Sequence, residues 1–80
     1  MQKKYYEITN IYEVAFLLTQ DFRYDRVEKT DGFIKFIFED KNTCIKLLNK
    51  LWAGTCTVNA KRMIDNISNL KRLIRSEKNG

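Results

Sequence analysis

The dipeptide Asp31-Gly32 constrains the fold of this chain more than any other feature. It separates two β-rich stretches, Phe22 to Thr30 and Phe33 to Glu39, in which the pattern of side chains repeats every two residues. Asp-Gly favours a type I′ turn, because both central positions of that turn need positive φ. The sequence therefore predicts a β-hairpin in which Val27 faces Phe36.

This register sorts the hairpin side chains into two faces, because successive residues of a strand point to opposite sides. One face is apolar and is expected to join the core; it carries Val27, Ile34, Phe36 and Phe38. The other face mixes aromatic and charged side chains; it carries Tyr24, Arg26, Glu28, Phe33, Lys35 and Ile37. The second face is either a solvent face or a contact surface.

Three segments with the apolar spacing of helices accompany the hairpin. The first spans 11–20, the second lies between Asp40 and Gly54, and the third spans about 60–76. Short β-prone segments at 5–9 and 55–58 precede the first and third helices. The order β-α-β-β-α-β-α predicts an α+β fold, ferredoxin-like or related, with a small antiparallel sheet and three helices. Because the first and fourth strands are short, a three-stranded sheet is the alternative.

Polar residues mark the expected helix ends. Asn10, either Asp40 or Asn42, and Asn59 are candidate N-caps, and Gly54 suits the end of the second helix. Glu13 stands where it would close a capping box with Asn10. We expect one domain over residues 1–76 and a frayed tail over 77–80.

The first helix is apolar over most of its circumference, which requires cover on two sides. A sheet supplies one side. The third helix or a second copy of the chain supplies the other side, so a homodimer is one of the two alternatives. The second helix presents Cys44, Ile45, Leu47, Leu48, Leu51 and Trp52 on one arc, where Trp52 is read as core or as the rim of an interface. The third is expected to turn Met63, Ile64, Ile67, Leu70 and Ile74 inward.

Charge is distributed unevenly along the chain. Residues 1–40 hold six basic and eight acidic side chains (6 − 8 = −2), whereas residues 41–80 hold nine and two (9 − 2 = +7), which together give the net charge of +5. Clustered cations raise the local potential and attract polyanions over about 8 Å at physiological salt. The basic second half therefore indicates either an anionic partner or a solvated basic face.

The composition argues against several kinds of chemistry. The chain has no His and only two Cys, so the usual zinc ligand sets cannot be assembled. The carboxylates of Asp21, Asp25, Glu39 and Asp40 lack an accompanying nucleophile or phosphate loop. We expect no catalytic residues, no metal, no cofactor and no enzymatic activity. The longest apolar run is Val14 to Leu18, shorter than the roughly 20 residues of a membrane span, and no targeting segment is recognisable, so a cytoplasmic protein without membrane contact is expected.

Two family resemblances bear on this reading. The segment from Tyr6 to Ile11 resembles the first-strand signature of the RNA-recognition fold, which has the same element order. The central signature of that fold is incomplete, because Asp31 to Phe36 offers one outward aromatic residue, Phe33, followed by Lys35.

The second resemblance covers almost the whole chain. Its motifs are Thr9-Asn10-Ile11-Tyr12, Ala15 to Leu18, Phe36 to Asp40, Leu51 to Gly54, Val58 and Leu70 to Ile74. These residues resemble a family of short uncharacterised proteins of bacteria and their phages, a domain of unknown function. Asn10 replaces the family's usual Asp, and Asp21 stands where Gly is common. The resemblance implies the same element order and a phage or mobile-element origin in a bacterium or an infected host cell, and it supplies no activity.

The sequence thus leads to two functional hypotheses. The first is a non-enzymatic protein that binds nucleic acid, mainly through phosphates, with Tyr24 and Phe33 as candidates to stack bases. Its candidate contacts are Lys46, Lys50, Lys61, Arg62, Lys71, Arg72 and Arg75, joined by Arg26 and Lys35 on the outer hairpin face. The second is a protein-interaction module that modulates a host protein through Tyr12, Phe16 and Leu17.

Overall fold

The hairpin forms as the sequence predicts. The computed structural model describes residues 4–79 and gives Asp31 and Gly32 positive φ, 48° and 82°. Strand β2 (Arg26–Thr30) pairs antiparallel with β3 (Phe33–Glu39), and Val27 faces Phe36. The turn chemistry and the two-residue period were sufficient to fix this register.

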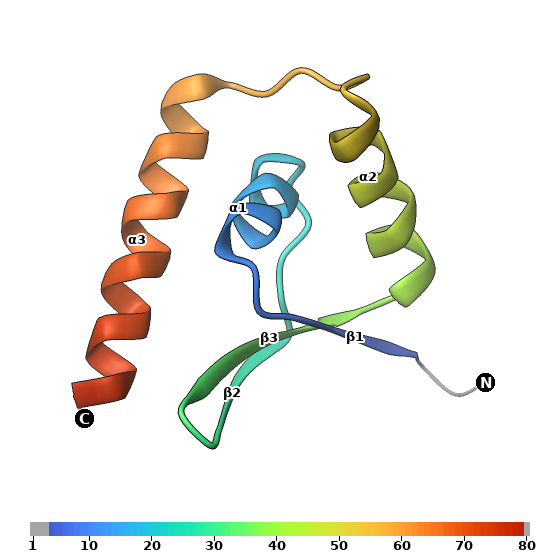
Figure 1. Ribbon diagram of the computed structural model, residues 1–80. Helices are drawn as coiled ribbons and strands as arrows, with labels where there is room; N and C mark the ends of the chain where they lie inside the picture. Colours follow the sequence, from blue (N-terminus) through green and yellow to red (C-terminus); the bar gives the residue numbers. More distant parts are fainter. Residues whose placement is uncertain (1–3, 80) are drawn as a thin grey trace.

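The sheet has three strands among the described residues. Strand β1 (Tyr5–Ile8) pairs antiparallel with the other edge of β3, so the order is β1-β3-β2. The α+β class is confirmed, but the fourth strand expected at 55–58 is wrong. Residues 55–59 are an irregular connection from helix α2 (Lys41–Ala53) to helix α3 (Ala60–Asn79), and they run across the end of the molecule farthest from the sheet (Figure 1).

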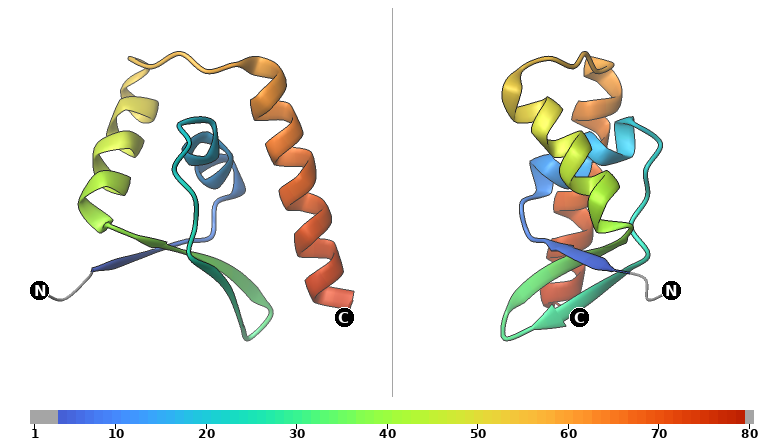
Figure 2. Two further views of the ribbon diagram at one scale, coloured as in Figure 1. Left: turned by 180° about the vertical axis from the view of Figure 1, so that it is seen from behind. Right: turned by 90° about the vertical axis from the view of Figure 1, so that its right-hand side faces the viewer.

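Helix α1 (Ile11–Thr19) lies over one face of the sheet, between α2 and α3 (Figures 1 and 2). Val14, Ala15, Phe16 and Leu17 are completely buried. The prediction that this helix is covered on two sides is confirmed, and elements of the same chain supply the cover. The molecule is flat, with principal extents of 37 × 37 × 18 Å.

The core lies where the inner face of the sheet meets the three helices. Phe36 and Phe38 of β3 are fully buried there, as the hairpin register predicted. Each helix contributes to the same cluster: Phe16 and Leu17 from α1, Cys44 and Leu48 from α2, and Leu70 from α3. Burial raises the pKa of the Cys44 thiol to about 11, because the thiolate would lose its hydration.

The predicted caps hold the helix ends. The Asn10 side chain accepts from the backbone N–H of Tyr12 at 2.9 Å, and Asn59 accepts from that of Arg62 at 2.9 Å. Asp40 caps α2 by accepting from the hydroxyl and the backbone N–H of Thr43, which lowers the pKa of its carboxyl. Gly54 ends α2 in the left-handed region, as expected.

Three side chains face differently from the prediction. Tyr24 packs edge-on against Phe36 and Phe38 in the core instead of lying on the outer face, because the chain bends at Asp25 before β2 begins. Trp52 of α2 is 65% exposed, and Ile64 of α3 is 63% exposed. Both lie at the margin of their helix's apolar arc.

The third helix also extends farther than predicted. It continues through Asn79, three residues beyond the expected end at Ser76; Gly80 lies outside the described residues. The Nζ of Lys29, near the tip of the hairpin, donates to the Glu77 carbonyl at 2.8 Å. This contact between the hairpin and the end of α3 has no signal in the local sequence.

Candidate nucleic-acid interface

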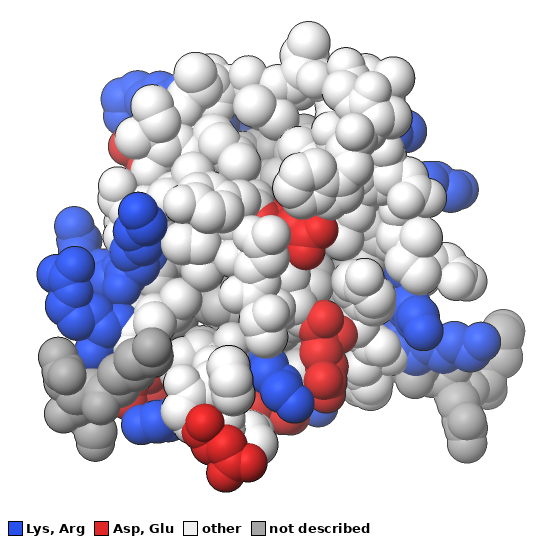
Figure 3. Space-filling view, in the orientation of Figure 1, with Lys and Arg blue, Asp and Glu red and all other residues white. Residues whose placement is uncertain are grey.

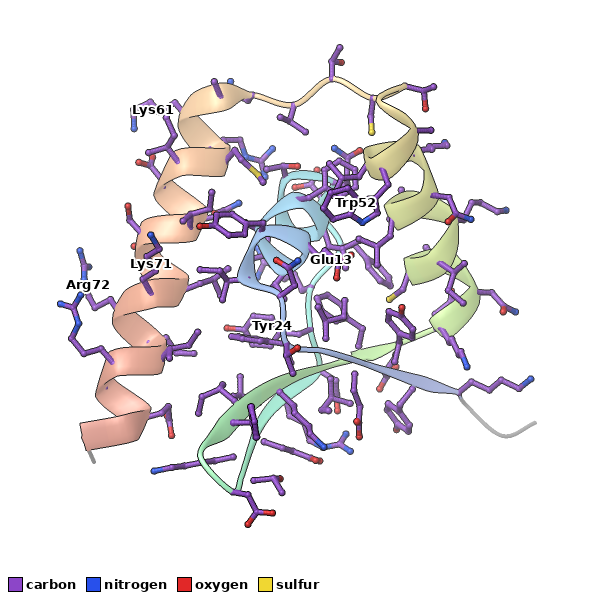
Figure 4. The ribbon with its side chains drawn as sticks, in the orientation of Figure 1. Glu13, Tyr24, Trp52, Lys61, Lys71 and Arg72 are labelled. Carbon is purple, nitrogen blue, oxygen red and sulfur yellow. The ribbon has the colours of Figure 1, made fainter. Side chains whose placement is uncertain are left out.

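The predicted cationic residues divide into two groups, those with and those without a carboxylate partner. Exposed cations of α3 without an ion-pair partner among residues 4–79 are Lys71, Arg72 and Arg75. Basic side chains gather along this flank of the molecule, over α3 (Figures 3 and 4). An unpaired and exposed cation keeps its full attraction for a phosphate, so these three are the strongest candidates.

Helix α2 provides a second, separate group. Lys46 and Lys50 are exposed and form no ion pair in the described part of the chain, although the charge of Lys46 helps to lower the pKa of the nearby Asp40 carboxyl. Because α1 lies between α2 and α3, the two groups occupy opposite flanks of the molecule (Figures 1 and 3). The structure therefore does not unite the cations of the second half into one patch.

Lys61 and Arg62 serve contacts within the chain. Lys61 forms an ion pair with Asp65 one helical turn later, at 2.8 Å, and that hydrogen bond raises the pKa of its ammonium. Arg62 reaches the end of α1, where its Nη2 donates to the Leu18 carbonyl at 3.3 Å and to Asp21 at 3.1 Å. Arg62 thereby ties α3 to the carbonyl end of α1.

The two cations of the outer sheet face are also paired. Arg26 donates to Asp25 at 2.8 Å and to Glu28 at 2.9 Å, and these bonds raise the pKa of its guanidinium. Lys35 lies 3.5 Å from Glu7. Carboxylates thus offset both cations, which makes this face a weaker site for phosphates than the helix flanks.

The aromatic residues proposed for base stacking differ in availability. Tyr24 is half-buried and packs against the core, with its ring centroid 5.2 Å from that of Phe36, so it does not lie on the outer face with Phe33. Phe33 is 65% exposed beside the hairpin turn. Of the residues predicted as a protein interface, Phe16 and Leu17 are completely buried within the chain, so that prediction is wrong for both, whereas Tyr12 is 51% exposed.

Sequence reasoning missed the position of Trp52. Its indole Nε1 donates to the Glu13 carboxylate at 2.8 Å, which joins the last turn of α2 to the first turn of α1 (Figure 4). Glu13, expected in a capping box with Asn10, is therefore engaged by a residue 39 positions away. The signal available in the sequence was the place of Trp52 at the edge of the apolar arc.

Two grooves border the loop between α1 and β2. A groove of about 430 Å³ is lined by Leu18, Asp21, Arg23, Tyr24, Arg62 and Asn66. A second, of about 350 Å³, is lined by Phe22, Arg23, Asp25, Glu39 and Asp40. In the second, Asp40 caps α2 and Asp25 pairs with Arg26. Within residues 4–79, no three His, Cys, Asp or Glu side chains are grouped to hold a metal ion.

The fold and these surfaces define a class, a small α+β protein whose charge lies on two helix flanks. No helix in the described range is both long and apolar enough to cross a membrane. The chain belongs to the family described as a domain of unknown function, DUF5659, which it matches over residues 3–76. No curated protein and no solved structure matches the chain.

Proposed function

We propose that this protein is a non-enzymatic module that binds nucleic acid through phosphate contacts from α2 and α3. The observation that carries the proposal is a set of exposed cations on α2 and α3 that form no ion pair within the described part of the chain, among them Lys46, Lys50, Lys71, Arg72 and Arg75. The carboxylates of the chain instead lie mostly in its first half, where several of them pair with Arg26, Lys35 and Arg62.

Contacts of this kind make binding depend on salt. Each phosphate that a cation neutralises releases counterions, so the logarithm of affinity falls with the logarithm of salt concentration by roughly 0.7 per contact for a single strand and roughly 0.9 for duplex DNA. The phosphate backbone is common to all sequences, so these contacts give affinity without sequence preference. A cytoplasmic location and a phage or mobile-element origin belong to the same proposal.

The test is binding of a labelled oligonucleotide, followed by fluorescence anisotropy over a series of salt concentrations. Replacing Arg72 and Arg75 with Gln should weaken binding and make the salt dependence less steep by about one to two contacts. The matched control is Lys61→Gln on the same helix, because Lys61 is already paired with Asp65. Absence of binding to single- or double-stranded DNA and to RNA at low salt would show that the proposal is wrong.

One observation favours a second function, docking of a protein partner such as a host protein. The face of the molecule seen in Figure 3 is largely uncharged between the two basic flanks. The chain also exposes apolar side chains, such as Tyr12 and Ile64. If this function holds, Ile64→Ala would abolish partner binding, while Arg72→Gln would leave it unchanged.

A further inference from the structure

Strand β2 has a free edge. In the order β1-β3-β2 it has a strand on one side only, and among residues 4–79 its backbone is hydrogen-bonded to no segment other than β3. The turn of this hairpin lies at the end of the molecule opposite the 55–59 connection (Figures 1 and 2). The free side of an edge strand presents unpaired N–H and C=O groups, which are available to a further strand.

The charges along this edge are arranged antisymmetrically about Val27. Residues 25–29 are Asp, Arg, Val, Glu and Lys, so their charges are negative, positive, neutral, negative and positive. When a second copy of the strand lies antiparallel to the first with Val27 opposite Val27, Arg26 meets Glu28 of the other copy, and Asp25 meets Lys29. Arg26 and Glu28 also share the outer face of the sheet, as directly opposite residues must.

This order of charges selects the occupant of the edge. Charged residues on an edge strand ordinarily discourage a further strand, because the side chains of that strand seldom match them. The antisymmetric order provides the match for one strand in particular, a second copy of β2. The other edge of the sheet has no such order, since Glu7 is the one charged residue of β1.

The side chains at this edge have donors to spare for a second copy. Arg26 donates from Nε to Glu28 and from Nη1 to Asp25, and its Nη2 has no partner among the described residues. The side chains of Arg26 and Glu28 are 47% and 42% exposed. Lys29 uses one of the three N–H bonds of its ammonium on the Glu77 carbonyl. Both cations can therefore hold a carboxylate of the other copy without giving up the contacts within their own chain.

We propose that two copies of this protein pair through their β2 edges, antiparallel and centred on Val27, to form one continuous six-stranded sheet. A two-fold axis at Val27 makes the contact isologous, so each ion pair across it occurs twice. The inference does not rest on the proposed function, whose cations lie on α2 and α3. It also differs from a dimer that covers α1, because elements of the same chain already cover that helix.

The test is the mass in solution, measured by sedimentation over a concentration series that reaches about 1 mM, so that a weak contact is also detected. The parent chain should rise from the 9.6 kDa of one copy toward twice that mass. Arg26→Glu and Glu28→Arg should each weaken association at least about tenfold, because each places like charges opposite one another twice. The matched control is Arg75→Glu on α3, which changes the net charge by the same amount as Arg26→Glu and should associate as the parent does.

A mixture of the two charge variants tests the register itself. The carboxylates of the Arg26→Glu chain then face the arginines of the Glu28→Arg chain, so the mixture should form a heterodimer with about the affinity of the parent. Thermal melts followed by circular dichroism verify that each variant is folded. If one is not, the double variant Arg26→Glu with Glu28→Arg replaces the mixture, because it keeps opposite charges within the chain and across the contact, and it should associate as the parent does.

Three results would overturn the inference. The first is a parent chain that keeps the mass of one copy over the whole series. The second is a dimer that Arg26→Glu and Glu28→Arg leave intact, since the contact would then lie elsewhere. The third is failure of the folded variants to associate when mixed, or of the folded double variant to associate with itself, because either would contradict the pairing centred on Val27.

Discussion

Helices α1 and α3 both carry an apolar stripe, yet the fold uses them in different ways. Four consecutive residues of α1, Val14 to Leu17, have no exposed surface, whereas on α3 Leu70 is 4% exposed and Ile64 is 63% exposed. The difference follows from the number of neighbours. The sheet, α2 and α3 surround α1, while α3 packs mainly on α1 (Figure 2). Helix α1, which is surrounded, contributes mainly to the stability of the domain. Helix α3 is covered on one side, and its remaining surface is exposed and carries charged side chains.

The largest loss of stability should come from a substitution that opens a cavity in the core beneath α1. Phe16→Ala removes a completely buried ring and should lower the free energy of unfolding by about 3–5 kcal/mol, the usual cost of the missing burial and the cavity. Such a loss is most of the stability of many small domains. Urea unfolding measures it, with Phe33→Ala as the exposed control expected within about 0.5 kcal/mol. A loss below about 1 kcal/mol for Phe16→Ala would contradict the central position of α1.

Truncating Leu70, the buried residue of α3, should cost less free energy of unfolding than truncating Phe16 at the centre of α1. Leu70→Ala should cost about 2–3 kcal/mol, toward the lower end for a buried leucine, because α3 is covered on one side only. Ile64→Ala, two turns earlier on the exposed side, should cost no more than about 0.5 kcal/mol. Equal losses in urea unfolding would show that α3 is rotated about its axis relative to the structure described.

The two N-caps offer a comparison at equal hydrogen-bond length. Asn10 and Asn59 each accept a backbone N–H at 2.9 Å, one at the start of α1 and the other at the start of α3. Asn10→Ala should cost about 1 kcal/mol, because the first turn of α1 is held between its neighbours. Asn59→Ala should cost no more than about 0.5 kcal/mol, since the end of α3 can fray locally.

Asn10→Asp is the control for the first cap, because it keeps an acceptor oxygen and places a negative charge at the helix N-terminus. Chemical unfolding of the three variants in the same buffer gives the differences. A larger loss of stability for Asn59→Ala than for Asn10→Ala would contradict the expectation that the start of α1 contributes more to stability than the start of α3.

The smallest effect on stability is expected at the cations of α3. Arg72 and Arg75 are exposed and unpaired in the described structure, so replacing both with Gln should change the free energy of unfolding by less than about 0.5 kcal/mol. Thermal melts check this directly. A retained melting temperature together with weakened oligonucleotide binding would place the loss in the contact, whereas a lowered melting temperature would assign these residues a role in the fold.

Local sequence determined the hairpin, its register, the helix caps and the unequal charge of the two halves. In each case the deciding interactions join residues that are close in sequence or directly paired: two positive φ angles at Asp31 and Gly32, and a side chain that accepts from the next turn at Asn10 or Asn59. Such interactions involve few residues, so the residue types at fixed spacings are enough to predict them.

Tertiary structure decided which apolar and charged residues remain available to a partner. The apolar arc of a helix shows which of its residues share a face, but not how many neighbours cover that face. Ile64 was therefore expected inside and lies outside, and Trp52, read as core or as the rim of an interface, is exposed. The same holds for charge: Arg62 and Asp21, 41 positions apart, neutralise one another only because α3 packs against the end of α1. Coverage and pairing depend on where distant elements meet, and that is why the candidate interface became visible only in the folded chain.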